Sequence, residues 1–183
     1  FSAKNASSLG SSMAALEAPL GVGRGPVSQT PRLARYCRRA EALAAIMAGR
    51  KGVVVAGTHG KTTTSALAAH TLRVGGKSPS HYVGAEIPIL GTNAHYDPAG
   101  EWFVAEGDES DGTLSEFRPH HAIVLNVDAE HLDFYANLEA ICREFANFAQ
   151  QTRETLVFCA DDPRLAELFA RRPGAISYGF HPL

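Results

Sequence analysis

A glycine-rich run with a lysine and threonines, GTHGKTTTS at residues 57–65, has the residue types that bind phosphate. Gly57 and Gly60 allow the backbone to bend and to approach a phosphate closely, and Lys61 can place a positive charge on terminal phosphate oxygens. The hydroxyl of Thr62 can coordinate Mg²⁺. The run therefore predicts a phosphate-binding loop. The other loop residues that we expect to contact a nucleotide are Thr58, His59 and Thr63.

Two flanking segments would position this loop. The apolar residues 53–56 predict a strand before it, and the alanine-rich residues 61–74, followed by two glycines, predict a helix after it. The first N–H groups of a helix lack partners within the helix, and the helix dipole favours an anion there. The common P-loop has four residues between its glycines, whereas Gly57 and Gly60 are separated by two. An ordinary strand-to-helix turn is the alternative interpretation.

An acidic run follows the next predicted strand. Residues 102–105 (WFVA) are apolar, and four carboxylates then fall within the six residues EGDESD at 106–111. Ligands of open α/β sheets bind at the carboxyl ends of the strands. If this strand lies beside residues 53–56, Glu106 can reach a Mg²⁺ held by phosphate oxygens and Thr62. A solvated acidic loop is the alternative.

A histidine follows a further predicted strand, the run AIVLNV at residues 122–127. His131 lies in the segment DAEHLD after that strand and could ligate a metal or hydrogen-bond a phosphate or carboxylate. A purely structural histidine is the alternative. We expect Lys61, Glu106 and His131 to converge at one edge of the sheet, because all three follow predicted strands.

The composition limits the class of protein. A chain of 183 residues that is 45% hydrophobic and 20% charged is typical of a globular domain. Its 17 Lys and Arg against 19 Asp and Glu indicate neither nucleic acid nor an anionic membrane as a partner. No apolar run approaches the roughly 20 residues of a membrane span. The three cysteines form no CxxC motif, so we expect free thiols in a cytoplasmic protein.

Strand and helix patterns alternate along most of the chain. Residues 1–37 predict a poorly ordered lead-in or a remnant of a preceding domain, because their first 30 residues are rich in Ser, Gly, Ala and Pro. Residues 38–183 form the predicted domain. Strands are also expected at 155–159 and 175–178, and the alternation predicts an α/β fold with a mainly parallel sheet and helices on both faces.

The predicted helices have definite buried positions. Residues 38–49 place Leu43, Ile46 and Met47 on one face, and residues 61–74 should pack Leu67 and Leu72 inward. A third helix at residues 137–150 has apolar residues at helical intervals, namely Leu138, Ile141, Phe145 and Phe148. Asp161 is the expected cap of a last helix that has Pro163 in its first turn.

Three of these segments together resemble the ATP-binding central domain of the Mur ligases. They are AGTHGKTTTS, VAEGDESD and AIVLNVDAEHLDFY, and the similarity runs from about residue 38 to residue 180. The resemblance implies the P-loop-type fold of that domain, incomplete at its carboxyl end. It also implies an amide-forming ligase of peptidoglycan synthesis, with ATP and Mg²⁺ as cofactors.

The resemblance further implies a reaction and roles for residues. ATP would phosphorylate the lactyl carboxylate of UDP-N-acetylmuramate, and the amine of L-alanine would attack the resulting acyl phosphate. Lys61 would hold the terminal phosphates, Thr62 and Glu106 would bind one Mg²⁺, and His131 would hold a second metal. The residues expected near the substrate are Ser110 and Asn126.

Details of the motifs bear on the branch of the family. The histidine before Gly60 and the sequence ESD favour the branch that adds L-alanine over the murein-recycling branch, which adds a tripeptide to UDP-N-acetylmuramate. Three positions depart from the family pattern: Glu130 replaces an aspartate, Gly107 replaces an alanine, and Gly84 is followed by Ala85 in place of a second glycine.

The resemblance covers only part of a ligase. The amino-terminal domain is not recognisable in residues 1–30, and the carboxyl-terminal domain, which closes over the central one, is not recognisable either. We therefore expect a fragment that is inactive alone. A nucleotide-binding module without ligase activity is the alternative. A P-loop GTPase or kinase is disfavoured by the short glycine spacing and by the lack of an Asn-Lys-x-Asp run.

Overall fold

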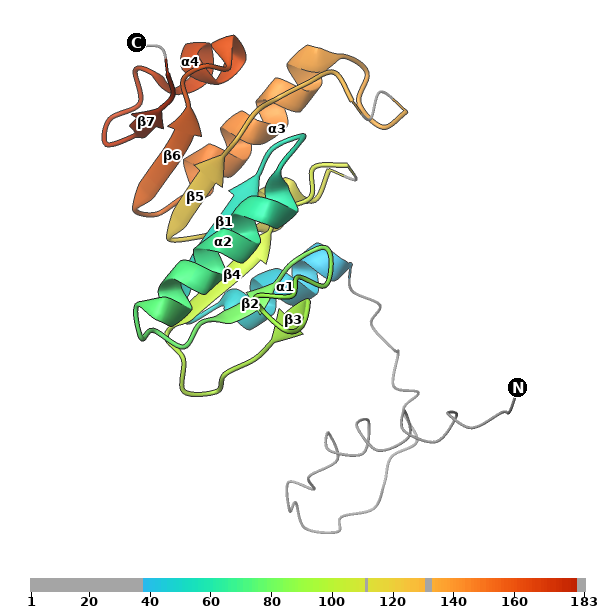
Figure 1. The fold of residues 1–183 in the computed structure, drawn as a ribbon. Coiled ribbons are helices and arrows are strands. Elements are labelled where there is room, and N and C mark those ends of the chain that lie inside the picture. Colours follow the sequence, from blue (N-terminus) through green and yellow to red (C-terminus); the bar gives the residue numbers. More distant parts are fainter. Residues whose placement is uncertain (1–37, 111, 131–132, 181–183) are drawn as a thin grey trace, which may run out of the picture. The chain divides into compact units, whose positions relative to one another are not determined.

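The computed structural model describes residues 38–110, 112–130 and 133–180 (Figure 1). Within these residues, seven strands form one sheet in the order β3-β2-β4-β1-β5-β6-β7. The strands are β1 (Lys51–Ala56), β2 (Ser80–Tyr82), β3 (Ala94–His95), β4 (Trp102–Glu106), β5 (His121–Val124), β6 (Thr155–Cys159) and β7 (Ile176–Tyr178). Only the β2–β3 pair is antiparallel among the described pairs, which confirms the expected mainly parallel sheet.

Strand β1, which leads into the predicted phosphate loop, lies between β4 and β5. Val55 of β1 pairs with Glu106 at the end of β4, and Ala56 pairs with Val124 at the end of β5. The two strands expected to carry the acidic run and the histidine therefore flank β1 on opposite sides. The predicted strand at 122–127 ends early at Val124, because the residues that follow it hydrogen-bond the loop after β1.

Helices cover both faces of the sheet, as expected. They are α1 (Arg39–Met47), α2 (Lys61–Val74), the 3₁₀ helix η2 (Leu114–Glu116), α3 (Leu138–Gln151) and α4 (Pro163–Phe169). Val54 and Ala56 of β1 pack into a cluster with α1, η2, α3 and α4, whereas Val53 packs into a second cluster with α2. This split follows from the alternation of side chains along a strand. Figure 1 shows α2 crossing the sheet on its own face.

The third predicted helix is confirmed as α3. Ile141, Phe145 and Phe148 are buried in the main core, and Leu138 packs partly against it. The side chain of Asn137 caps the helix by accepting a hydrogen bond from the backbone N–H of Ala140 at 3.0 Å. Burying each large apolar side chain contributes roughly 1.5–3 kcal/mol, so this helix is a principal support of the sheet.

Two predicted core residues are exposed instead. Ile46 of α1 is 46% exposed and Leu67 of α2 is 62% exposed, so both predictions were wrong. The first helix buries Ala40, Leu43 and Met47, a stripe that passes beside Ile46. The second buries small residues, namely Ser65, Ala66 and Ala69, which let it approach the sheet closely, while Leu72 is only partly covered.

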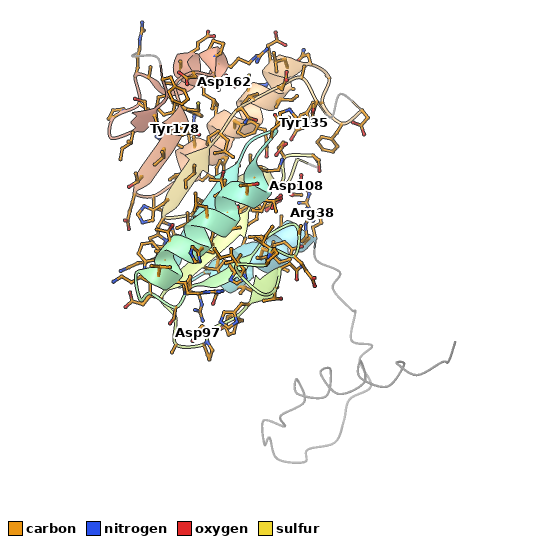
Figure 2. The ribbon with its side chains drawn as sticks, viewed as in Figure 1. Arg38, Asp97, Asp108, Tyr135, Asp162 and Tyr178 are labelled. Atoms are coloured by element: carbon orange, nitrogen blue, oxygen red, sulfur yellow. The ribbon has the colours of Figure 1, made fainter. Side chains whose placement is uncertain are left out.

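The cap of the last helix was also assigned one residue too early. Asp162, not Asp161, accepts hydrogen bonds from the backbone N–H groups of Arg164 and Leu165, at 2.9 and 3.1 Å. Figure 2 labels Asp162 beside this helix. The helix begins at Pro163, and the N-cap is the residue immediately before the first helical one. Asp161 instead accepts a hydrogen bond from the backbone N–H of Phe180.

None of the described helices combines the length and the apolar character that crossing a bilayer requires. Cys142 and Cys159 are free thiols and half-buried, while Cys37 lies outside the described residues.

Candidate functional site

The predicted phosphate loop connects the end of β1 to the start of α2. Gly57 has φ +142° and Gly60 has φ +84°, backbone conformations that favour glycine. A methyl group at Gly57 would lie 3.1 Å from the backbone nitrogen of Asn126, so the loop also needs glycine there for close approach. Gly60 precedes the first residue of α2, which places Lys61 and Thr62 in the first helical turn.

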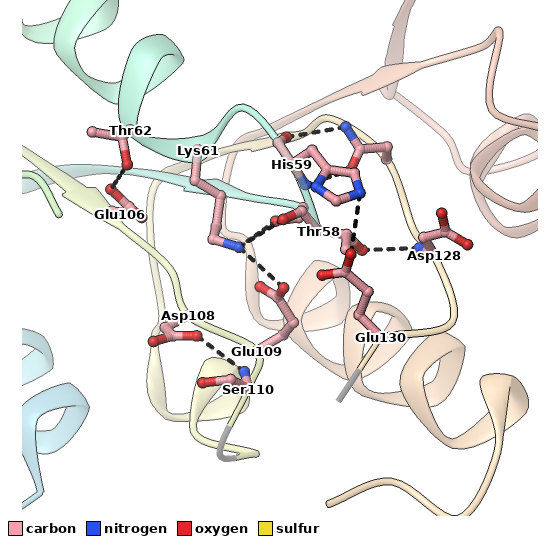
Figure 3. Close-up of polar contacts among 12 residues, drawn as sticks. Thr58, His59, Lys61, Thr62, Glu106, Asp108, Glu109, Ser110, Asp128 and Glu130 are labelled. Atoms are coloured by element: carbon pink, nitrogen blue, oxygen red, sulfur yellow. Dashed lines mark hydrogen bonds and ion pairs between the residues drawn. The ribbon is translucent and has the colours of Figure 1, made fainter. Parts of the chain in front are cut away.

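The side chain of Lys61 donates hydrogen bonds to three acceptors, two in the loop and one after β4. Its Nζ donates to the backbone oxygens of Gly57 and Thr58, at 2.7 and 3.2 Å. It also donates to Oε1 of Glu109 at 3.0 Å, and the two side chains are only 14% and 1% exposed (Figure 3). Burial raises the pKa of the Glu109 carboxyl, and the positive charge of Lys61 opposes that rise.

Thr62 and Glu106 form a pair of oxygen donors beside the loop. The hydroxyl of Thr62 donates to Oε2 of Glu106 at 2.9 Å (Figure 3). The backbone N–H of Gly84 donates to the same oxygen at 2.8 Å. This brings together the two residues that sequence reasoning assigned to one magnesium ion. Their contact follows from the pairing of β1 with β4, which ends at Glu106.

The donor set fits a magnesium ion that is shared with a nucleotide. Within the residues that the structure describes, no group of three or more His, Cys, Asp or Glu side chains could hold a metal by itself. Mg²⁺ usually takes one or two carboxylates together with substrate phosphates and water. Thr62 and Glu106 supply the protein oxygens for such a site, and phosphates bound on the adjacent loop would supply others.

The segment after β5 forms hydrogen bonds with the phosphate loop on the side opposite β4. The backbone N–H of His59 donates to Oδ1 of Asn126 at 2.7 Å, and Nδ2 of Asn126 donates back to the oxygen of His59 at 3.0 Å. The backbone N–H of Asp128 donates to the hydroxyl of Thr58 at 2.9 Å. The expected position of Asn126 near the substrate stays a prediction. In the structure its amide hydrogen-bonds the backbone of His59.

Asp108 of the acidic run contacts α1. Asp108 forms an ion pair with Nη2 of Arg39 at 2.6 Å and accepts a hydrogen bond from the backbone N–H of Ser110 at 3.0 Å. Burial opposes ionisation of Asp108, but hydrogen bonds from Ser110 and Arg39 outweigh it and lower the pKa of the carboxyl. Figure 3 shows Asp108 facing Ser110, while Glu109 faces Lys61. The expected contact of Ser110 with substrate stays a prediction.

The remaining predicted residues are either exposed near the loop or outside the described residues. Glu130 places Oε1 3.5 Å from Nε2 of His59, and both side chains are largely exposed. Thr63 is exposed on the first turn of α2. His131 lies outside the described residues, so its convergence with Lys61 and Glu106 stays a prediction.

Sequence reasoning missed two features of this site. Glu109 was counted among the carboxylates, but its contact with Lys61 was not predicted, because the sequence does not show which acid of the run faces the loop. Tyr135 was given no role, yet its hydroxyl donates to the backbone oxygen of Glu109 at 2.6 Å. Tyr135 is buried, and a buried tyrosine hydroxyl usually has a hydrogen-bond partner, but no pattern in the sequence indicated this burial.

The sheet, with a phosphate-type loop at the carboxyl end of its central strand, defines a P-loop-type α/β domain. Residues 55–182 match the family model of the Mur ligase middle domain. The chain therefore belongs to the Mur ligase middle-domain family.

The chain is also similar in sequence to individual members of the family. The UDP-N-acetylmuramate–L-alanine ligase of Mycobacterium ulcerans (strain Agy99) is 50% identical over 131 residues, which are 70% of this chain and 27% of that protein. The enzyme of the same name from Arthrobacter sp. (strain FB24) is 46% identical over 135 residues, which are 73% of this chain and 29% of that protein. The chain thus spans about a quarter of the length of the curated relatives it matches.

Solved structures share the fold. The UDP-N-acetylmuramate–alanine ligase of Thermotoga maritima has a TM-score of 0.67 at 30% identity, covering 78% of this chain and 31% of that one. A UDP-N-acetylmuramate:L-alanyl-gamma-D-glutamyl-meso-diaminopimelate ligase from Neisseria meningitides has a TM-score of 0.67 at 25% identity, covering 76% of this chain and 49% of that one. Both branches considered from the sequence therefore have this domain.

Proposed function

We propose that this chain is the nucleotide-binding part of an ATP-dependent ligase that joins L-alanine to UDP-N-acetylmuramate during the synthesis of peptidoglycan precursors. The observation that carries the proposal is the arrangement of Lys61, Thr62 and Glu106 around one loop. The loop lies in a domain that is 50% identical to part of a relative bearing that name. Residues 38–183 would be the central domain of the ligase, and residues 1–37 would precede it.

The residues of the loop suit the first half of such a reaction. A lactyl carboxylate oxygen attacks the terminal phosphorus of ATP, the bond to the bridging oxygen breaks, and ADP leaves. Positive charge and backbone N–H groups placed in advance at the phosphates stabilise the transition state of this transfer. Lys61 and the first turn of α2 supply both, and a Mg²⁺ held by Thr62 and Glu106 would neutralise further phosphate charge.

The second half needs an amine placed beside the activated carboxylate. The amine nitrogen of L-alanine attacks the acyl carbon, the bond from that carbon to the phosphate oxygen breaks, phosphate leaves, and the nitrogen loses a proton. Residues near the substrate would orient both partners. Asn126 and Ser110 are our candidates for this role, together with His131, and the rest of the ligase would supply the remaining contacts.

The activity is tested with the complete product of the source gene. Release of ADP from MgATP should require UDP-N-acetylmuramate and L-alanine together, with neither sufficient alone. ADP release with L-alanyl-γ-D-glutamyl-diaminopimelate in place of L-alanine would move the assignment to the recycling ligase. If neither L-alanine nor the tripeptide supports ADP release, both assignments are rejected.

A nucleotide-binding module without ligase activity is a second candidate. It is favoured by the observation that the hydrogen bonds of the described site hold the loop and its acidic neighbours, the parts that would meet a nucleotide. Calorimetry of MgATP with the 183-residue chain tests the loop, and the ADP-release assay separates the two candidates. Binding without any amine-dependent ADP release by the complete product would support the module.

A further inference from the structure

The ion pair between Lys61 and Glu109 lies within the proposed nucleotide loop. Nζ of Lys61 and Oε1 of Glu109 are 3.0 Å apart, and Glu109 is 1% exposed. A lysine ammonium has three N–H donors and no acceptor. Among the described residues, the three acceptors around Nζ are Glu109 Oε1 and the backbone oxygens of Gly57 and Thr58, so every donor has a partner in this structure.

A phosphate oxygen can bind Nζ only if one of these three acceptors is released. The two backbone oxygens belong to residues just before Lys61 and are neutral, whereas the carboxylate of Glu109 comes from the loop after β4 and carries charge. Keeping the carboxylate would place two anions around one ammonium. Exchanging the carboxylate for a phosphate replaces one anion by another, so the charge of Lys61 stays compensated throughout.

The backbone of Glu109 is anchored independently of the contact between its side chain and Lys61. The backbone oxygen of Glu109 accepts hydrogen bonds from the hydroxyl of Tyr135 at 2.6 Å and from the backbone N–H of Gly112 at 3.2 Å. The neighbouring Asp108 is anchored to Arg39 on α1. The backbone is therefore fixed at several points, and rotation of the side chain is the smallest change that releases Lys61.

We propose that Glu109 is a positioning residue that occupies the place of a phosphate on Lys61 in the empty loop and is displaced when a nucleotide binds. This inference rests on the proposed function, because it requires that the loop binds a nucleotide. It assigns a distinct role to each acid of the run: Glu106 to the metal, Glu109 to Lys61, and Asp108 to the anchor on α1.

The test compares MgADP binding by calorimetry in the wild-type 183-residue chain and in its Glu109→Gln variant. Glutamine keeps the shape of the side chain but removes the competing charge, so the variant should bind MgADP roughly tenfold more tightly. A substitution that merely damaged the loop would weaken MgADP binding. Tighter binding by the variant would therefore indicate that Glu109 competes with the phosphate. Glu101→Gln is the control, since it removes an exposed carboxylate at the opposite end of β4, and it should leave the affinity within roughly twofold.

A second measurement does not depend on the variant folding. In a crystal structure of the wild-type chain with Mg²⁺ and a non-hydrolysable ATP analogue, Nζ of Lys61 should lie beside a phosphate oxygen. Its distance from Oε1 of Glu109 should exceed 4 Å, compared with 3.0 Å in the present structure.

The outcomes separate the two proposals. Equal or weaker binding by Glu109→Gln, with normal binding by the wild type, would overturn the exchange and leave the proposed function standing. A retained contact between Lys61 and Glu109 in the nucleotide complex would do the same. Absence of MgADP binding by the wild type would overturn the nucleotide function, and the exchange with it.

Discussion

Both polar atoms of the Asn126 amide hydrogen-bond the backbone of His59. Oδ1 accepts from the His59 N–H at 2.7 Å, and Nδ2 donates to the His59 oxygen at 3.0 Å. His59 lies in the middle of the phosphate loop and Asn126 lies beyond the end of β5, so this pairing continues the β1–β5 ladder into the loop. The loop is shaped by a side chain that is 67 residues away in sequence.

Asn126→Leu should weaken MgADP binding by the chain roughly tenfold, because it removes two hydrogen bonds worth about 0.5–1.5 kcal/mol each. Calorimetry without any other substrate measures this effect. Asp128→Asn is the control, since among the described residues the Asp128 side chain accepts only from its neighbour Ala129. Unchanged nucleotide affinity in Asn126→Leu, with loss of activity in the complete enzyme, would instead show a role for Asn126 confined to the substrate.

Lys61→Ala should lower the ligase rate of the complete enzyme by roughly 100-fold or more, because it removes a charge placed in advance at the terminal phosphates. Steady-state ADP release at saturating MgATP measures the loss. Lys51→Ala is a suitable control, since Lys51 lies at the opposite end of β1. A rate near that of the wild type would exclude the role assigned to Lys61.

Glu106→Gln should abolish most of the gain in ADP affinity that Mg²⁺ provides. The gain should fall by at least roughly tenfold, because Glu106 is the proposed direct ligand of the metal and the loss of an outer-shell partner alone costs roughly 10–100-fold. ADP affinity without Mg²⁺ should not fall, because the substitution removes a negative charge near the phosphates. Calorimetry with and without Mg²⁺ gives both values, and Glu86→Gln, an exposed acid on the neighbouring loop, should keep the full gain.

Gly57→Ala should destabilise the chain by about 2–3 kcal/mol in chemical denaturation. A Cβ at this position would lie 3.0 Å from the Cβ of Leu125 and 3.1 Å from the nitrogen of Asn126, on a backbone with φ +142°. Gly91→Ala is the control, because Gly91 has φ +78° with nothing within 4 Å. It should lose only about 1 kcal/mol from its backbone conformation, and equal losses would show that close packing against Asn126 is unimportant.

The stability of the chain should depend on pH through His81. This side chain is 1% exposed, and burial lowers its pKa from the ordinary 6.5, with the charges of Arg73 and His95 acting in the same direction. The unfolded imidazole therefore takes up a proton at a higher pH than the folded one. The contribution of His81 to stability is present above pH 6.5 and is lost as the pH falls through the lowered pKa.

The comparison of His81→Gln with the wild type isolates this effect. The difference in unfolding free energy between the two proteins should shrink as the pH falls from about 7.5 to about 5, by about 1.4 kcal/mol for each unit of pKa shift. His59→Gln is the control, since the side chain of His59 is 61% exposed in the loop after β1, whereas His95 itself contributes to lowering the pKa of His81. A difference that stays constant over this range would contradict the assignment.

Local patterns in the sequence predicted the elements that a short stretch of chain determines. The loop after β1 depends on Gly57, Gly60 and Lys61, which lie within five residues of one another. The buried face of α3 follows from apolar residues at helical intervals, since helix geometry alone brings them together. The alternation of strands and helices was sufficient for the parallel sheet, because parallel strands need a crossover connection.

Single-residue assignments were less reliable where two neighbours were equally suitable. Asp161 and Asp162 both precede Pro163, and only the observed start of α4 shows that Asp162 caps the helix. Leu67 seemed suited to the core, but α2 packs on the sheet through Ser65, Ala66 and Ala69. Side-chain volume alone does not determine which face of a helix is buried, because the rotation of the helix depends on its partner.

By itself, the sequence determined a phosphate-type loop, a mainly parallel sheet and the family to which the chain is similar. The tertiary structure decided which acid contacts which partner: Glu106 meets Thr62, while Glu109 meets Lys61. The regular alternation of side chains ends with β4, so the direction of each later side chain depends on contacts with Arg39 and Tyr135, which come from distant parts of the chain. Such contacts form only when the chain has folded, and local spacing does not encode them.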